Sequence, residues 1–91
     1  MGREIVLFKS EEKKSATEIA QTLRLIADKV DSGTMTLKQG DSDVTLEFPG
    51  QMKLELKVEE EQGRKHLKKS FEIELEWIPG QADDAGGATI L

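Results

Sequence analysis

Apolar residues recur at helical spacing near the start of the chain. They are Ala16, Ile19, Ala20, Leu23, Ile26, Ala27 and Val30. Because an α-helix turns once in 3.6 residues, these side chains share one stripe, and Leu25 is the one large apolar residue off it. Ser15 and Glu18 fit a capping box at the helix start, and Gly33 fits a left-handed cap at its end. The pattern predicts an amphipathic helix between these two caps.

After Gly33 the apolar period changes to two. The sets are Met35 and Leu37; Val44, Leu46 and Phe48; Met52, Leu54, Leu56 and Val58; and Phe71, Ile73, Leu75 and Trp77. Alternation of this kind predicts four strands that share one apolar face. Gly40-Asp41 suits a type II′ hairpin turn and Pro49-Gly50 a type II turn. Glu4–Phe8 is a candidate fifth strand ahead of the helix.

The charged residues test the strand register independently, because they were not used to choose it. Apolar matching pairs Leu37 with Val44, Phe48 with Met52, and Val58 with Phe71. The charge pairs that follow are Lys38–Asp43, Glu47–Lys53, Asp43–Lys57, Lys53–Glu76, Lys57–Glu72, Glu60–Lys69 and Glu61–Lys68. Opposite charges facing each other across strands favour pairing, and like charges oppose it. Only Glu55, which falls opposite Glu74, breaks the pattern.

These elements predict an α+β fold of order β-α-β-β-β-β. One amphipathic helix packs on one face of a mainly antiparallel four- or five-stranded sheet. The expected core residues beneath the helix are Leu23, Leu46, Leu54, Ile73 and Leu75. Residues 1–79 are predicted to form a single domain, and residues 80–91, rich in Gly, Ala and Asp, a flexible C-terminal tail.

A family resemblance rests on the capped helix from Ser15 to Val30 and on two strand motifs. The motifs are Val44-Thr45-Leu46-Glu47-Phe48-Pro49 and Glu72-Ile73-Glu74-Leu75-Glu76-Trp77, and the segment Leu7-Phe8-Lys9-Ser10 fits as well. Together they resemble the amphi-Trp domain, which is named for an amphipathic strand that ends in tryptophan. The resemblance covers about residues 4 to 77 and implies a small prokaryotic protein or module. It implies no activity, ligand or functional residue.

Composition narrows the functional classes. The chain has 91 residues, no cysteine and a net charge of −5 from 18 acidic and 13 basic residues. The lack of cysteine excludes disulfides, thiolate metal sites and cysteine nucleophiles. The longest apolar run, Ile5–Phe8, is far shorter than the ~20 residues of a membrane span, and the first residues lack the apolar stretch of a signal peptide. We therefore expect a cytoplasmic protein without membrane contact.

The residue types also argue against catalysis. His66, the only histidine, lies in a predicted loop among basic residues, and no serine sits in a Gly-x-Ser-x-Gly elbow. Asp41-Ser42-Asp43 lacks the glycine and distal glutamate of a calcium loop, and alternate members of Glu59-Glu60-Glu61 point to opposite faces of a strand. We expect no enzyme activity, no cofactor and no metal site.

One basic cluster and one tryptophan remain as interaction candidates. The candidate residues are Arg64, Lys65, His66, Lys68, Lys69 and Trp77. The cluster could bind phosphates or an acidic partner, but no aromatic residue interleaves with it as a stacking platform for bases would require. The expected function is a non-enzymatic protein-interaction module, monomeric or weakly self-associating. The alternative is a weak nucleic-acid binder that uses the basic tip 64–69.

Overall fold

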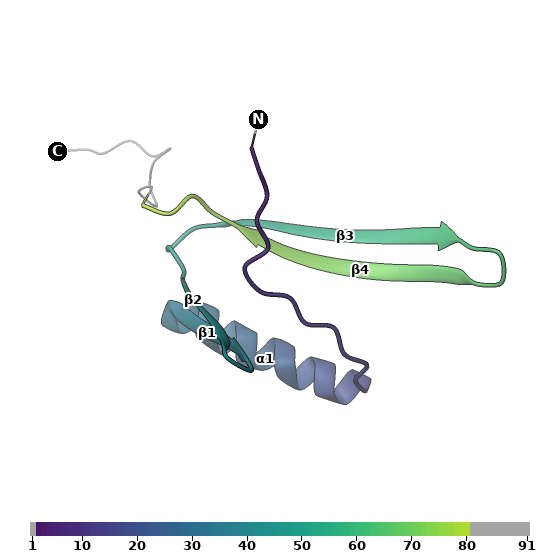
Figure 1. Cartoon of the computed structure of the whole chain (residues 1–91), viewed down its shortest axis with the longest axis horizontal. Helices are drawn as coiled ribbons and strands as arrows, with labels where there is room; N and C mark the ends of the chain where they lie inside the picture. Colours follow the sequence, from purple (N-terminus) through teal and green to yellow (C-terminus); the bar gives the residue numbers. More distant parts are fainter. Residues whose placement is uncertain (1, 81–91) are drawn as a thin grey trace. The chain divides into compact units, whose positions relative to one another are not determined.

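The structure, a computed structural model, describes residues 2–80 and has an α+β fold (Figure 1). Helix α1 spans Ala16–Ser32 and is followed by strands β1 (Thr34–Gln39), β2 (Ser42–Glu47), β3 (Lys53–Gln62) and β4 (Leu67–Glu76). The strands form two antiparallel sheets of two strands each, β1–β2 and β3–β4. The chain divides into two compact units after Phe48. The first unit holds α1 and the β1–β2 hairpin, and the second holds the β3–β4 hairpin.

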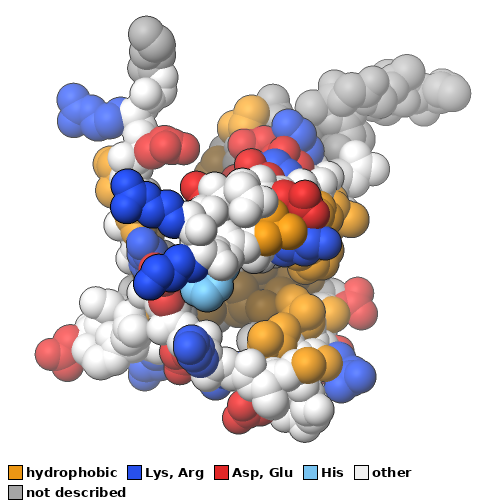
Figure 2. All heavy atoms as spheres, turned by 90° about the vertical axis from the view of Figure 1, so that its right-hand side faces the viewer, with side chains coloured by type: hydrophobic (Ala, Val, Ile, Leu, Met, Phe, Trp, Pro, Cys, Tyr) orange, Lys and Arg blue, Asp and Glu red, His pale blue; other side chains and the backbone are white. Residues whose placement is uncertain are grey.

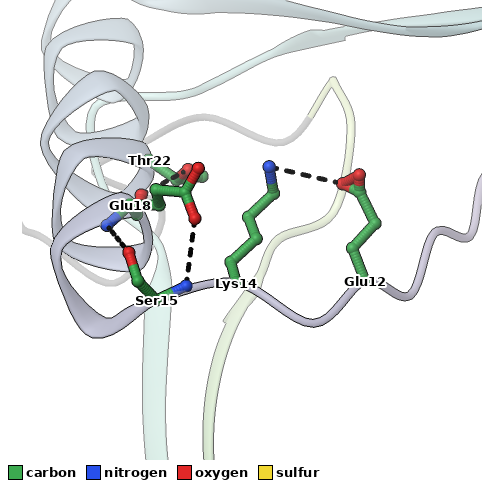
Figure 3. Close-up of polar contacts among 5 residues, drawn as sticks. All are labelled: Glu12, Lys14, Ser15, Glu18 and Thr22. Atoms are coloured by element: carbon green, nitrogen blue, oxygen red, sulfur yellow. Dashed lines mark hydrogen bonds and ion pairs between the residues drawn. The ribbon is translucent and has the colours of Figure 1, made fainter.

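Both predicted helix caps are confirmed. The Ser15 hydroxyl accepts a hydrogen bond from the Glu18 backbone N–H at 3.1 Å, and the Glu18 carboxylate accepts one from the Ser15 N–H at 3.0 Å (Figure 3). These bonds lower the pKa of the Glu18 carboxyl, and Lys14 contributes by its positive charge. At the other end Gly33 has φ 97° and ψ −4°, and its N–H donates to the carbonyl oxygens of Lys29 and Val30. Backbone groups that the helix ends leave without partners are thereby satisfied.

The first hairpin forms in the predicted register. Leu37 pairs with Val44 and Lys38 with Asp43, and the hydroxyls of Thr36 and Thr45 lie 2.9 Å apart. Gly40-Asp41 is the two-residue loop. Gly40 has φ 59°, and no described non-glycine residue has a positive φ, which matches the type II′ turn. Helix α1 contacts β1. The half-buried apolar residues of this unit are Phe8, Ala20, Ile26, Val30, Met35, Leu37, Val44, Leu46 and Phe48.

The second hairpin also has the predicted register over ten residue pairs. Lys53 faces Glu76, Lys57 faces Glu72, and Glu55 faces Glu74. Four cross-strand ion pairs form, at N–O distances of 3.7 Å for Lys53–Glu76, 3.5 Å for Lys57–Glu72, 3.6 Å for Lys68–Glu61 and 3.3 Å for Lys69–Glu60. The charges therefore match the pairing chosen by the apolar residues.

Two predictions about pairing are wrong for residues 2–80. Glu4–Phe8 forms no strand there, because the segment has no hydrogen-bonded neighbour, and Ile5 is 72% exposed. The expected match of Phe48 with Met52 across Pro49-Gly50 is also absent, since β2 and β3 belong to different sheets. An alternating pattern identifies a strand but does not identify its neighbour.

The expected core does not form within either unit. Leu46 and Leu75 are half-buried, whereas Leu23, Leu54 and Ile73 are 44%, 57% and 47% exposed. A two-stranded hairpin has only its own side chains to cover its apolar face. The single domain over residues 1–79 stays a prediction, and the predicted tail, residues 80–91, lies outside the described residues except for Gly80.

Candidate functional site

The basic tip of the second hairpin is a tight loop between β3 and β4. Gln62 pairs with Leu67, and the Gly63 N–H donates to the His66 carbonyl oxygen at 2.8 Å. This bond closes the loop that carries Arg64 and Lys65. Figure 2 is viewed from this end of Figure 1 and shows the histidine beside Lys and Arg side chains. A shallow hollow is lined by the loop and the adjoining ends of both strands.

The five basic candidates of the tip differ in their ion pairing. Lys68 pairs with Glu61 and Lys69 with Glu60, so acidic residues of β3 neutralise both lysines. Arg64 and Lys65 are exposed and make no ion pair with any described residue, and the exposed His66 lies next to them. The positive charge that remains at the tip therefore comes from Arg64 and Lys65. The register predicted from the sequence already placed these glutamates opposite the two lysines, and the ion pairs confirm it.

Trp77 does not belong to the same site. Trp77 follows the last residue of β4 and is half-buried. Met52, which precedes the first residue of β3, is half-buried as well. The tip lies at the opposite end of this hairpin, about 30 Å away at ~3.4 Å per residue. The structure thus separates the predicted candidates into the basic tip, residues 64–69, and a tryptophan at the other end.

The opposed carboxyls of Glu55 and Glu74 lie midway along the same hairpin. Glu55 raises the pKa of the Glu74 carboxyl by a side-chain hydrogen bond and by its negative charge. A hydrogen bond between two carboxyl groups requires one of them to carry a proton. Lys57 lines a shallow hollow together with Glu55 and Glu74. The negative charge of Glu59, and to a smaller extent that of Glu72, raises the pKa of Lys57. Among residues 2–80 no three histidine, aspartate or glutamate side chains gather in a way that could hold a metal ion.

An exposed apolar face is the feature that the sequence did not predict. Leu54, Leu56, Val58, Phe71 and Ile73 lie on one side of the β3–β4 hairpin, opposite the ion pairs of Lys53, Lys57 and Lys68, and they are between 47% and 72% exposed. Alternation located these residues correctly on one face. It could not show that the hairpin itself leaves them uncovered.

The comparisons with known proteins identify the family. The profile of the Amphi-Trp domain matches residues 1–91, the whole chain, and the chain therefore belongs to this family. No curated protein and no solved structure matches the chain. No helix within residues 2–80 is long and apolar enough to cross a membrane.

Proposed function

We propose that this Amphi-Trp domain protein is a non-enzymatic protein-interaction module whose basic tip binds an acidic segment of a partner protein. The proposal rests on a difference in ion pairing among the basic side chains of the tip. Lys68 and Lys69 have glutamate partners, whereas Arg64 and Lys65 are exposed without one among residues 2–80. A loop closed by its own backbone bond presents these two cations at little cost in ordering them.

An acidic protein segment suits the tip better than a nucleic acid does. Between Glu59 and Ser70 there is no Phe, Tyr or Trp side chain for bases to stack on. Two unpaired cations on a small loop match a short run of carboxylates. Weak binding of nucleic acid at the same loop is the second candidate, favoured only by the clustering of the basic residues.

Amide chemical shifts tested with two probes distinguish these candidates. A short poly-glutamate peptide should shift the amides of residues 63–69 at low ionic strength, and the shifts should vanish at high salt. An oligothymidylate of equal charge should shift them less. The double variant Arg64→Glu/Lys65→Glu should abolish the response.

Lys13→Glu/Lys14→Glu is the matched control, since it makes the same charge change at another exposed adjacent pair. It should leave the response unchanged. If the control variant removes binding as fully as the tip variant does, net charge rather than the tip is responsible. A larger response to the oligonucleotide would favour the nucleic-acid candidate, and no response to either probe would refute both.

The packing of the helix on the two hairpins is a second part of the proposal. We propose that the apolar stripe of α1 covers the apolar faces of both hairpins, so that residues 1–79 share one core. The support is that each element on its own leaves large side chains exposed: Leu23 on the helix, Leu54 and Ile73 on the second hairpin. Burying such surface is the main favourable term in folding. A cytoplasmic location and a prokaryotic origin complete the proposal.

A further inference from the structure

The outer edge of β4 is long and regular. β4 spans ten residues, pairs with β3 one to one without a bulge, and contains no proline. Within residues 2–80 β3 is its only hydrogen-bonded neighbour. Every second residue therefore directs its backbone N–H and C=O away from β3. An edge of this kind is a template for another strand unless charges, prolines or a bulge block it.

The order of charges along β4 is self-complementary. The polar face carries Lys68, Ser70, Glu72, Glu74 and Glu76, so its positive charge lies at one end and its negative charges at the other. An antiparallel neighbour with the same sequence presents the reverse order. When the two-fold axis passes between the two Phe71 residues, Lys68 faces the partner's Glu74 and Leu67 faces the partner's Leu75.

Other registers of the same edge are poorer. An axis at Glu72 places this carboxylate directly against its own copy, which opposes pairing. An axis at Ser70 joins only residues 67–73 of β4, whereas the axis at Phe71 joins residues 67–75. The register centred on Phe71 combines the longer overlap with no pair of like charges. In this register, residues of the two copies that lie opposite each other also point to the same face of the joined sheet, since side chains alternate along a strand.

We propose that two copies of this chain associate through the outer edges of their β4 strands in this register. The product is a four-stranded antiparallel sheet, β3-β4-β4-β3, with a two-fold axis perpendicular to it at Phe71. Glu74, which faces the like charge of Glu55 within the hairpin, gains a lysine neighbour from the second copy. The apolar residues of both hairpins lie on one side of the joined sheet. The proposal uses the strand edge and is independent of the function proposed for the basic tip.

Two charge-reversed variants test the register without weakening either hairpin. Glu61→Lys/Lys68→Glu reverses an ion pair of the hairpin and keeps it intact, but it puts a negative charge at position 68 of the edge. Glu74→Lys replaces a like-charge pair of the hairpin by an attractive one. Each variant alone places like charges at both ends of the dimer edge. Its dimer should dissociate at least about tenfold more readily than the parent's, equivalent to 1.4 kcal/mol.

An equimolar mixture of the two variants should restore dimers. In the mixed pair position 68 of each copy faces the opposite charge at position 74 of the other. Sedimentation velocity of the full chain up to about 1 mM measures the association. Parent protein that is monomeric over this range would overturn the proposal. So would single variants that dimerise as the parent does, or a mixture that stays monomeric.

Two further variants check the position of the axis. Lys53→Glu/Glu76→Lys reverses an ion pair of the hairpin and keeps it intact, and position 76 lies beyond the residues paired in the dimer, so this dimer should be unchanged. In the register centred on Glu72 the lysine introduced at position 76 would face Lys68 of the other copy and would disrupt the dimer instead. The chain has no cysteine, so Phe71→Cys should form an intermolecular disulfide on mild oxidation and Glu76→Cys should not. A dimer weakened by the charge change at position 76, or a disulfide that forms at position 76 and not at position 71, would refute the register.

Discussion

Replacement of Leu54 by alanine distinguishes an open second hairpin from one covered by the helix. Leu54 lies opposite Leu75 in the β3–β4 ladder and is 57% exposed. Full burial of a leucine side chain contributes about 1.5–3 kcal/mol, so an open hairpin that covers less than half of Leu54 loses about 1 kcal/mol on truncation. If α1 covers this face, truncation also leaves a cavity, and the loss in the free energy of unfolding rises to about 2–5 kcal/mol.

Leu25→Ala provides a matched control. Leu25 has the same exposed fraction, 57%, but it lies off the apolar stripe of α1. Its truncation should cost about 1 kcal/mol or less, because alanine is also the better helix former. Urea unfolding monitored by circular dichroism gives both values. Equal losses for the two variants would refute the covered face, whereas a loss at Leu54 that exceeds the loss at Leu25 by more than about 1 kcal/mol would support it.

Three further predictions follow from local geometry. Ser15→Ala removes the hydroxyl that caps the helix and should lower the free energy of unfolding by about 1 kcal/mol, measured by thermal melts. Gly33→Ala should lower the free energy of unfolding by about 1–2 kcal/mol in urea melts, because φ 97° is a conformation that L-residues rarely adopt. A Cβ at this position would meet no atom within 4 Å, so the cost comes from the backbone. An unchanged free energy would show that the cap can rearrange. Glu74→Gln should stabilise the hairpin at neutral pH. Because the pKa of Glu74 is raised in the folded state, the parent regains this stability as pH falls through that pKa. The stability advantage of the variant, measured in melts at several pH values, should therefore shrink on acidification. An advantage that does not depend on pH would contradict the carboxyl pairing.

The sequence predicts the parts of this fold whose determinants lie close together along the chain. The helix start follows from Ser15 and Glu18, which are three residues apart and satisfy each other's backbone groups. The register of the second hairpin follows from two independent patterns, the apolar residues and the charges, which agree on the same pairing. Even the exception at Glu55 and Glu74 was predictable, because a fixed register determines every pair within it.

The parts that the sequence does not predict depend on partners far along the chain. The apolar run from Ile5 to Phe8 resembles a strand, but a strand forms only when another edge binds it. At Pro49-Gly50 the turn residues permit a hairpin between β2 and β3 without requiring one. The candidate site differs in this respect, because the predicted register already placed Glu60 and Glu61 opposite Lys69 and Lys68, as the ion pairs confirm.

The short loops of the two hairpins have a consequence for how the chain folds. Both strand pairs join neighbours in the sequence, through loops of two and four residues. Loops of about ten residues close in about 10–100 ns and hairpins form in about 1–10 μs, so neither step limits a small domain. The slow step is then the assembly of preformed elements. A destabilising substitution at Gly40 or in the 63–66 loop should change the folding rate more than the unfolding rate, because the hairpins are already formed at the slow step, whereas one on the apolar stripe of α1 should change both rates.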